Sequence, residues 1–145
     1  MSYTISEIAR KLNIAPSAIR YYDKEGLIPG VKRTSGGMRA FTESDLSWLK
    51  LISCLKRAGM SIKDIRQYVE YAQKGDETID ARLKLIHNQR ALLLKQMQEL
   101  QDTLDVVDYK CWYYETAKAA GTADGITEDA IPEKFRAVAK RLRGE

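Results

Sequence analysis

The sequence predicts a mainly α-helical protein, in which a winged helix-turn-helix domain is followed by a long coiled-coil helix. Three observations lead to this prediction. Two short amphipathic segments with a tight turn between them precede a basic hairpin pattern. Two further segments then begin with helix-capping residues, and residues 77–120 contain neither proline nor glycine. We expect three parts: residues 1–75, the long helix of 76–118, and a tail of 119–145 containing a short helix.

The first predicted helix covers residues 4–12. Thr4 and Glu7 have the spacing of a capping box, in which each residue satisfies an unpaired backbone N–H of the other. An apolar stripe with helical spacing follows, made of Ile5, Ile8, Ala9 and Leu12. Residues 13–15 form a short turn, so a second helix is expected to follow directly.

The second predicted helix starts at Pro16, which suits a first helical turn, and ends at Gly26. Helical spacing places Ser17, Arg20, Tyr21 and Lys24 on one face and turns Ile19 and Tyr22 inward. Cations, a phenol and a hydroxyl suit phosphates and base edges better than a core. Taken alone, a short basic helix is more often a solvated surface; the preceding helix and the following hairpin favour the DNA-reading interpretation.

A basic hairpin is predicted after this helix. Lys32, Arg33 and Arg39 flank the turn sequence of residues 35–37, Ser-Gly-Gly. Helix, turn, helix and ribbon is the order of a winged DNA reader. The predicted DNA contacts are Thr4, Ser17, Ala18, Arg20, Tyr21, Tyr22, Lys24, Lys32, Arg33, Arg39 and Lys56.

Two linking helices are predicted between the hairpin and the long helix. The first follows a second capping box, Thr42 with Asp45, and covers residues 43–57; the second follows Ser61 and ends at Gly75. Lys56 and Arg57 at the end of the first helix have two interpretations. They contact a flanking phosphate as a second wing, or they are solvated cations favoured by the helix dipole.

The long helix carries a seam with a period of 3.5 residues. Only Arg90 interrupts the apolar or aromatic positions Ile79, Leu83, Ile86, Leu93, Met97, Leu100, Leu104, Val107, Cys111 and Tyr114. A helix of about 40 residues is about 60 Å long, and no second helix of the chain matches that length. The pattern therefore predicts a coiled coil between two copies of the chain, with the positions from Ile79 to Val107 as the interface, parallel or antiparallel.

Charge is unevenly distributed along the chain. Residues 1–75 hold 13 Lys and Arg against 7 Asp and Glu, whereas residues 76–145 hold 11 against 13. A basic front half indicates a polyanionic partner for that half. Neither a signal peptide nor a membrane span is expected, and two distant cysteines do not indicate a secreted disulfide scaffold. We expect a cytoplasmic protein.

Several consecutive segments carry a family resemblance. They are ISEIARKLNIAPSAIRYYDKEGLIPGVKRTSGGMRAFTESDL, then LKRAGMSIKDIRQYV, then the long helix. Over about the first 115 residues the chain resembles MerR-family transcriptional regulators. The resemblance implies a homodimer with antiparallel long helices, bound to a pseudo-palindromic promoter. It also implies that the protein untwists an overlong spacer so that RNA polymerase engages.

The effector that such a regulator senses is predicted partly by elimination. Metal-sensing members of the family carry cysteines where this chain reads GDETID and AKAAGTADGITED, so no metal site and no cofactor are expected. The run LISCLKRAGMSIKDI resembles the AdhR/NmlR-like branch, which answers aldehydes and other electrophiles through a cysteine at the position of Cys54. The competing interpretation is that Cys54 is a small buried apolar residue.

Cys111 lies in the seam, so packing is the first interpretation of this second candidate redox residue. The adjacent aromatic residues 112–114 form either a small-molecule pocket or interface packing against the other subunit's Trp48 and Cys54. In the tail, Pro132 is expected to start a helix with Phe135, Val138, Ala139 and Leu142 on one face.

Other classes of function find less support in the residues. No phosphate-binding glycine loop and no nucleophile–base pair is present, so the chain is not expected to be an enzyme. The alternative is a coiled-coil adaptor whose basic head binds RNA or another acidic partner, or a membrane. RNA readers usually need a stacking aromatic sheet, and the early helices use their apolar faces for the core.

Overall fold

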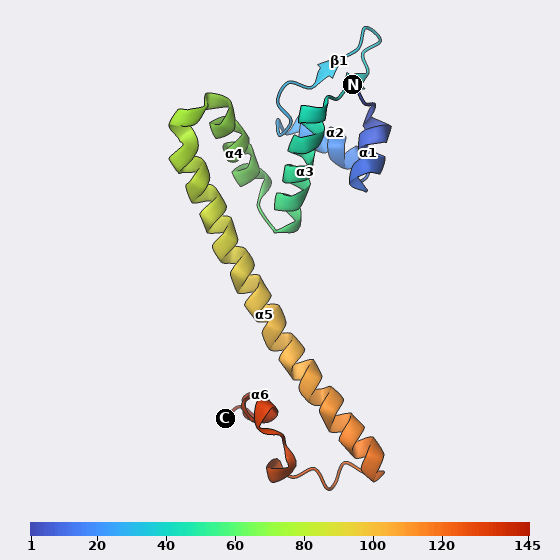
Figure 1. The fold of residues 1–145 in the computed structure, drawn as a ribbon, viewed down its shortest axis with the longest axis vertical. Helices are drawn as coiled ribbons and strands as arrows, with labels where there is room; N and C mark the ends of the chain where they lie inside the picture. The colour runs from blue at the N-terminus through green and yellow to red at the C-terminus, as the bar shows by residue number, and fades with distance from the viewer. The chain divides into compact units, whose positions relative to one another are not determined.

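A computed structural model describes residues 1–145 and divides into two compact units, Met1–Leu93 and Leu94–Glu145. It confirms the mainly α-helical class, with a helix-turn-helix, a two-stranded wing and a long helix (Figure 1). The helices are α1 (Ile5–Leu12), α2 (Pro16–Lys24), α3 (Glu43–Arg57), α4 (Ile62–Lys74), α5 (Ile79–Ala120) and α6 (Glu133–Arg143). The strands are β1 (Lys32–Arg33) and β2 (Arg39–Ala40), and η1 (Asp76–Thr78) and η2 (Glu128–Ala130) are 3-10 turns. None of the helices combines the length and apolarity needed to cross a membrane.

Local capping explains where α1 and α3 begin. The Thr4 hydroxyl accepts from the Glu7 N–H, and the Glu7 carboxylate accepts from the Thr4 N–H at 2.8 Å. Thr42 and Asp45 make the same exchange at the start of α3. Both predicted capping boxes are confirmed. At α4 the Ser61 hydroxyl accepts from the Asp64 N–H at 3.1 Å, which is half of a box.

The core of the first unit lies where α1, α2, α3 and α4 meet. Its fully buried side chains are Ile8, Ile19, Leu27, Phe41, Leu49, Ile52, Ile65 and Val69. The Trp48 indole donates to the Leu27 carbonyl at 2.6 Å and stacks on Tyr68, with ring centroids 5.9 Å apart. These contacts fix α3 against both α4 and the segment that follows α2.

The wing is an antiparallel pair with Lys32 opposite Ala40 and Arg33 opposite Arg39. Gly37 in the connecting turn has φ +80°, a conformation that glycine adopts without strain. An isolated bridge between Tyr3 and Phe41 joins the chain start to the end of the wing. The wing is therefore fixed at its base, although each strand has two residues.

The predicted seam residues divide into two groups. Ile86 is half-buried and packs with Leu85 against the core of the first unit, so it is not a pure interface position. The others are 39–70% exposed in the single chain: Ile79, Leu83, Leu93, Met97, Leu100, Leu104 and Val107. Leu92 and Leu94 are exposed beside them. The division predicted at residue 76 stays a prediction, whereas the compact units meet within α5.

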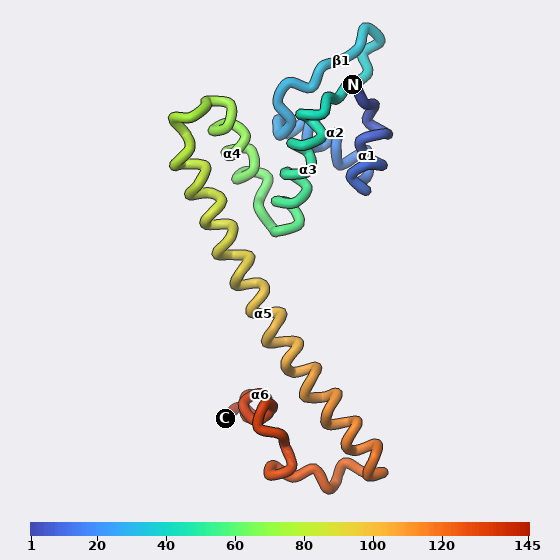
Figure 2. The backbone as a smooth tube through the Cα atoms, viewed as in Figure 1, coloured from blue at the N-terminus to red at the C-terminus, as the bar shows by residue number.

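In the second unit the chain turns back after α5, and α6 packs beside residues 106–113 of that helix (Figure 2). Tyr109, Ile131, Val138 and Ala139 are buried there, and Val106, Trp112, Tyr113 and Phe135 pack around them. Trp112 and Tyr113 are half-buried against the chain's own tail, so the tail covers part of the aromatic surface predicted for a pocket or for interface packing, and Tyr114 is exposed. Leu142, predicted on the same face as Phe135, is 49% exposed.

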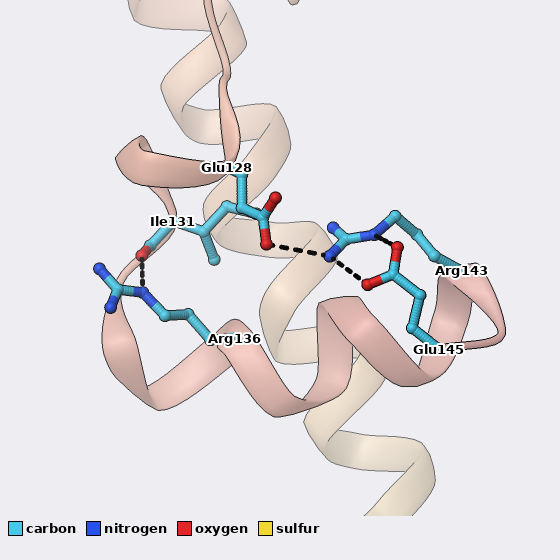
Figure 3. A network of polar contacts seen from close by, with 5 residues as sticks. All are labelled: Glu128, Ile131, Arg136, Arg143 and Glu145. Carbon is cyan, nitrogen blue, oxygen red and sulfur yellow. Dashed lines mark hydrogen bonds and ion pairs between the residues drawn. The ribbon is translucent and has the colours of Figure 1, made fainter.

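Polar contacts hold the ends of the tail (Figure 3). Arg136 donates to the Ile131 carbonyl at 3.1 Å, and the Arg143 guanidinium donates to Glu128 at 3.3 Å and to Glu145 at 3.0 Å. The hydrogen bond from Arg143 lowers the pKa of the Glu145 carboxyl below its ordinary value. The Arg143 pairs are solvent-exposed, so the apolar contacts contribute more to docking α6.

Candidate nucleic-acid interface

The outer face of α2 is polar and available. Ser17, Arg20, Tyr21 and Lys24 are exposed, and the Tyr21 side chain is 47% exposed despite its large apolar ring. Ile19 on the opposite face is fully buried. The structure therefore orients α2 as its periodicity predicts, with the core fixing the helix and the cations free.

The wing brings a second set of cations to the same place. Arg20 of α2 and Arg33 and Arg39 of the wing line one shallow hollow of about 180 Å³. Ile5, Gly37 and Met38 complete its wall. Residues from two separate sequence segments thus form one basic surface.

Ion pairing neutralises the acidic residues at the end of α2, Asp23 and Glu25. Arg39 donates through Nε to Asp23 at 2.5 Å, with both side chains about one-fifth exposed. Arg66 of α4 pairs with the Glu25 carboxylate and donates to the Glu25 carbonyl at 3.0 Å. Arg20 and Lys24 make no ion pair in the structure, so α2 presents net positive charge.

Two predicted contacts in the wing have partners within the chain itself. Arg39 fixes β2 to α2 through Asp23, so its guanidinium has a structural partner before any DNA approaches. Arg33 donates to the Gly37 carbonyl at 2.9 Å, which stabilises the wing turn. Lys32 is exposed and has no such partner. Arg66 was missed because neither spacing nor local pattern links it to Glu25.

Three further predicted contacts are partly engaged within the chain itself. The Thr4 hydroxyl is committed to Glu7 in the capping box. Ala18 is half-buried, and Tyr22 is half-buried against the core. Burial raises the pKa of the Tyr22 phenol, and the neighbouring Tyr21 raises it further, so the hydroxyl stays protonated and can donate.

Both cysteines are free and exposed in the single chain. In the single chain Cys54 is thus not covered by the core of its own unit, and its role stays a prediction. Cys111 lies in an open apolar hollow of about 500 Å³ on α5, together with Val107 and Tyr114. No group of three or more His, Cys, Asp or Glu side chains gathers closely enough to hold a metal ion.

A helix-turn-helix with a basic wing and a long helix defines a class of winged DNA-binding regulators. Two family models identify the particular family: the MerR HTH family regulatory protein model matches residues 3–72, and the MerR DNA-binding model matches residues 46–108. The chain belongs to the MerR family of transcriptional regulators, and it is not an enzyme.

Individual relatives agree with this assignment. An uncharacterised HTH-type transcriptional regulator of Haemophilus influenzae is 44% identical over 133 residues, covering 92% of this chain and 98% of the relative. AdhR of Bacillus subtilis is 34% identical over 91 residues, covering 63% of this chain and 65% of the relative.

Solved structures show the same fold. HiNmlR, a MerR-family regulator lacking the sensor domain, was crystallised bound to promoter DNA. It superposes with a TM-score of 0.76 at 44% identity, covering 87% of this chain and 100% of that chain. A putative MerR-family regulator of Listeria monocytogenes superposes with a TM-score of 0.76 at 33% identity, covering 82% and 90% of the respective chains. The resemblance to the AdhR/NmlR-like branch is thereby confirmed.

Proposed function

We propose that the chain binds a pseudo-palindromic promoter as a homodimer and controls transcription in response to a reactive electrophile. The convergence of Arg20 and Arg33 on one basic surface carries the DNA-binding part of this proposal. Because Asp23 of α2 and Glu25 just after it are ion-paired, neither carboxylate is free to oppose a phosphate there. HiNmlR, similar in sequence and fold, binds promoter DNA.

We assign different tasks to the exposed residues. Arg20 and Tyr21 project from α2, which suits base edges in the major groove, while Ser17 and Lys24 flank them. Lys32 and Arg33 on the wing suit phosphates of the adjoining backbone. Arg39 acts on DNA binding mainly by holding the wing against α2.

Dimerisation follows from the exposed stripe of α5. Leu93, Met97, Leu100 and Leu104 are each at least 39% exposed in the single chain, and they share one seam. A second copy of α5 covers such a stripe, and it places two α2 helices for two half-sites. RNA polymerase is then an indirect partner, because it binds the same promoter.

Measuring operator affinity against salt concentration tests the DNA-binding proposal. Arg20→Ala should weaken operator binding by about 1–3 kcal/mol, because it removes a base-edge contact. Lys32→Ala should weaken binding to all sequences evenly and reduce the salt slope by about one. Lys95→Ala on α5 is the matched control, since it removes one exposed cation far along the sequence from both.

An unchanged affinity and salt slope for Arg20→Ala would contradict the assignment of the α2 face. Equal affinity of the wild-type chain for RNA would favour the adaptor function instead. Measuring transcription from the promoter by RNA polymerase then tells whether the chain regulates transcription or only binds DNA.

Cys54 is the residue that we propose reacts with the electrophile. Its side chain is exposed on α3, so an aldehyde or quinone reaches the sulfur without unfolding. A covalent adduct adds volume at the outer surface of α3, a helix whose other side packs in the core of the first unit through Leu49, Ile52 and Leu55. In the proposed homodimer the other subunit packs near this surface, and a packed interface responds to added volume by shifting, which biases a two-state regulator.

The thiol proposal is tested with single serine variants. Cys54→Ser should bind the operator as the wild type does and lose induction by formaldehyde, methylglyoxal or a quinone. Cys111→Ser is the matched control and should keep induction. If Cys54→Ser still induces, the electrophile does not act at this thiol.

A further inference from the structure

Arg66 of α4 contacts the residue that ends α2. Its Nε donates to the Glu25 carbonyl oxygen at 3.0 Å, and its Nη2 pairs with the carboxylate of the same residue. The two residues are 41 positions apart in the sequence. No other side chain of α4 makes a hydrogen bond or an ion pair to α2 or to Glu25. One guanidinium thus joins two helices through two separate contacts.

The contact with the carbonyl caps the end of α2. Glu25 is the C-cap residue of this helix, and its own N–H donates to the Tyr21 carbonyl at 2.9 Å. The last carbonyls of an α-helix have no partner within the helix. A guanidinium at this end supplies a donor and lies at the negative end of the helix dipole. Arg66 therefore holds the backbone of α2 as well as a side chain.

The other end of α4 is fixed to α5. The Gly75 carbonyl, at the corner between the two helices, accepts from the Thr78 N–H at 3.1 Å and from Arg82 of α5 at 3.1 Å. The Thr78 hydroxyl is buried and lies 2.8 Å from the same carbonyl oxygen. These contacts hold α4 and the start of α5 together at the corner.

The ion pair of Asp23 continues this connection from α2 to the wing. Asp23, in the last turn of α2, accepts from Arg39 of β2 at 2.5 Å. Polar contacts therefore lead from α5 through α4 to the end of α2 and then to the wing, all within the first unit. They end at the two elements that carry Arg20 and Arg33 of the basic surface.

Stability alone explains little of the Arg66 contact. The Arg66 and Glu25 side chains are 40% and 27% exposed, and an ion pair with such exposure contributes little to folding. Ile65 and Val69 are fully buried and already hold α4 in the core. A guanidinium with two partners adds geometric specificity, because both contacts are kept only in one relative orientation of the two helices.

We propose that Arg66 is a positioning residue for operator binding, which sets the orientation of α2 relative to α4 and α5 by holding Glu25. This inference rests on the proposed function, in which a dimer places two α2 helices on two half-sites. A dimer whose α2 helices are held rigidly fits one distance between half-sites. Arg66 thus contributes to the discrimination between operators of different spacing without contacting DNA itself.

Operator spacing provides the test. The probe is a duplex selected from random sequence by the wild-type chain, together with copies whose half-sites are one base pair further apart or closer. The spacing preference is the ratio of the affinities for the selected and the altered duplexes. Arg66→Ala should reduce this preference about fivefold, because the contact that orients α2 is lost. Lys74→Ala is the matched control, since it removes an exposed cation from the same helix and should keep the preference.

A second variant tests whether Arg66 acts through Glu25. Glu25→Ala should also reduce the spacing preference, and combining it with Arg66→Ala should reduce the preference no further, because both changes break the same pair. Thermal melting of each variant checks folding. The inference is overturned if Arg66→Ala weakens binding to all spacings evenly, as loss of a phosphate contact would. It is also overturned if Glu25→Ala keeps the wild-type preference.

Hydrogen exchange on the DNA-free chain separates this inference from the proposed function. Arg66→Ala should speed the exchange of amides in the last turn of α2 and leave those of α1 unchanged. If the wild type selects no duplex, the proposed function fails, and the exchange alone decides whether Arg66 holds α2. If the wild type selects a duplex but Arg66→Ala changes neither the exchange nor the spacing preference, only the inference fails.

Discussion

Two faces of the second half of α5 differ in how they are covered. On one face, α6 packs over Val106, Tyr109, Trp112 and Tyr113. The other face displays Leu100, Leu104, Val107, Cys111 and Tyr114, of which Leu100 is 70% and Tyr114 is 63% exposed. The same helix therefore has one apolar face covered by its own chain and another without a partner.

The difference shows what each face requires. A covering helix of 11 residues is enough for an aromatic cluster confined to two turns, because large rings bury much area per residue. The seam extends along α5 in both units, far beyond the reach of α6. Only a helix of similar length covers such a stripe, and a second copy of α5 has that length.

Charges placed in the exposed face should have the largest effect. We expect the double variant Leu93→Glu, Leu100→Glu to be a monomer that loses specific DNA binding. In a dimer each new carboxylate would be buried in the seam, which costs more than the interface gains. Sedimentation at micromolar concentration and operator binding measure the two effects. Lys95→Glu is the control off the stripe and should remain dimeric. A wild-type chain that sediments as a monomer would refute the interpretation of the exposed face.

Truncation in the covered face should have an intermediate effect. Phe135 contacts both Tyr109 and Trp112, with ring centroids 5.9 and 6.1 Å apart. Phe135→Ala should destabilise the docking of α6 by about 2 kcal/mol, less than for a fully buried phenylalanine. Hydrogen exchange of α6 amides measures this loss. Leu142→Ala, in the same helix but half-exposed, should change exchange little, and the dimer should persist in both variants.

The rate of thiol alkylation tests whether the exposed face of α5 is covered in the wild-type protein. Cys111 lies in the exposed face, so dimerisation should slow its alkylation about tenfold relative to the Leu93→Glu, Leu100→Glu monomer. Mass spectrometry gives the rate at each cysteine separately. Equal rates at Cys111 in monomer and wild type would place the interface elsewhere along α5.

Titration of the tail should give the smallest effect. Because Arg143 lowers the pKa of Glu145 in the folded chain, this pair stabilises α6 above the ordinary carboxyl pKa. The contribution is lost as pH falls through the lowered pKa. Helix melting followed by circular dichroism should show Glu145→Gln slightly less stable than the wild type at pH 7 and equal to it in strong acid. A difference that persists in acid would assign the effect to something other than this charge.

Local signals in the sequence determined most of the fold. Capping boxes join residues three positions apart, so Thr4 with Glu7 and Thr42 with Asp45 are visible in the sequence itself. The bounds 43–57 of α3 followed from such a box and the glycine after the helix. The polar face of α2 and the exposed stripe of α5 followed from periodicity, which depends only on helix geometry.

Contacts between distant segments were decided by the tertiary structure. Arg39 and Asp23 are 16 positions apart and Arg66 and Glu25 are 41 apart, and no local pattern pairs such residues. Likewise, the sequence showed aromatic residues at the end of α5 but not that the tail covers Trp112 while Tyr114 stays exposed. Periodicity assigns a residue to a face of its own helix; which element packs on that face depends on how the whole chain fills its cores.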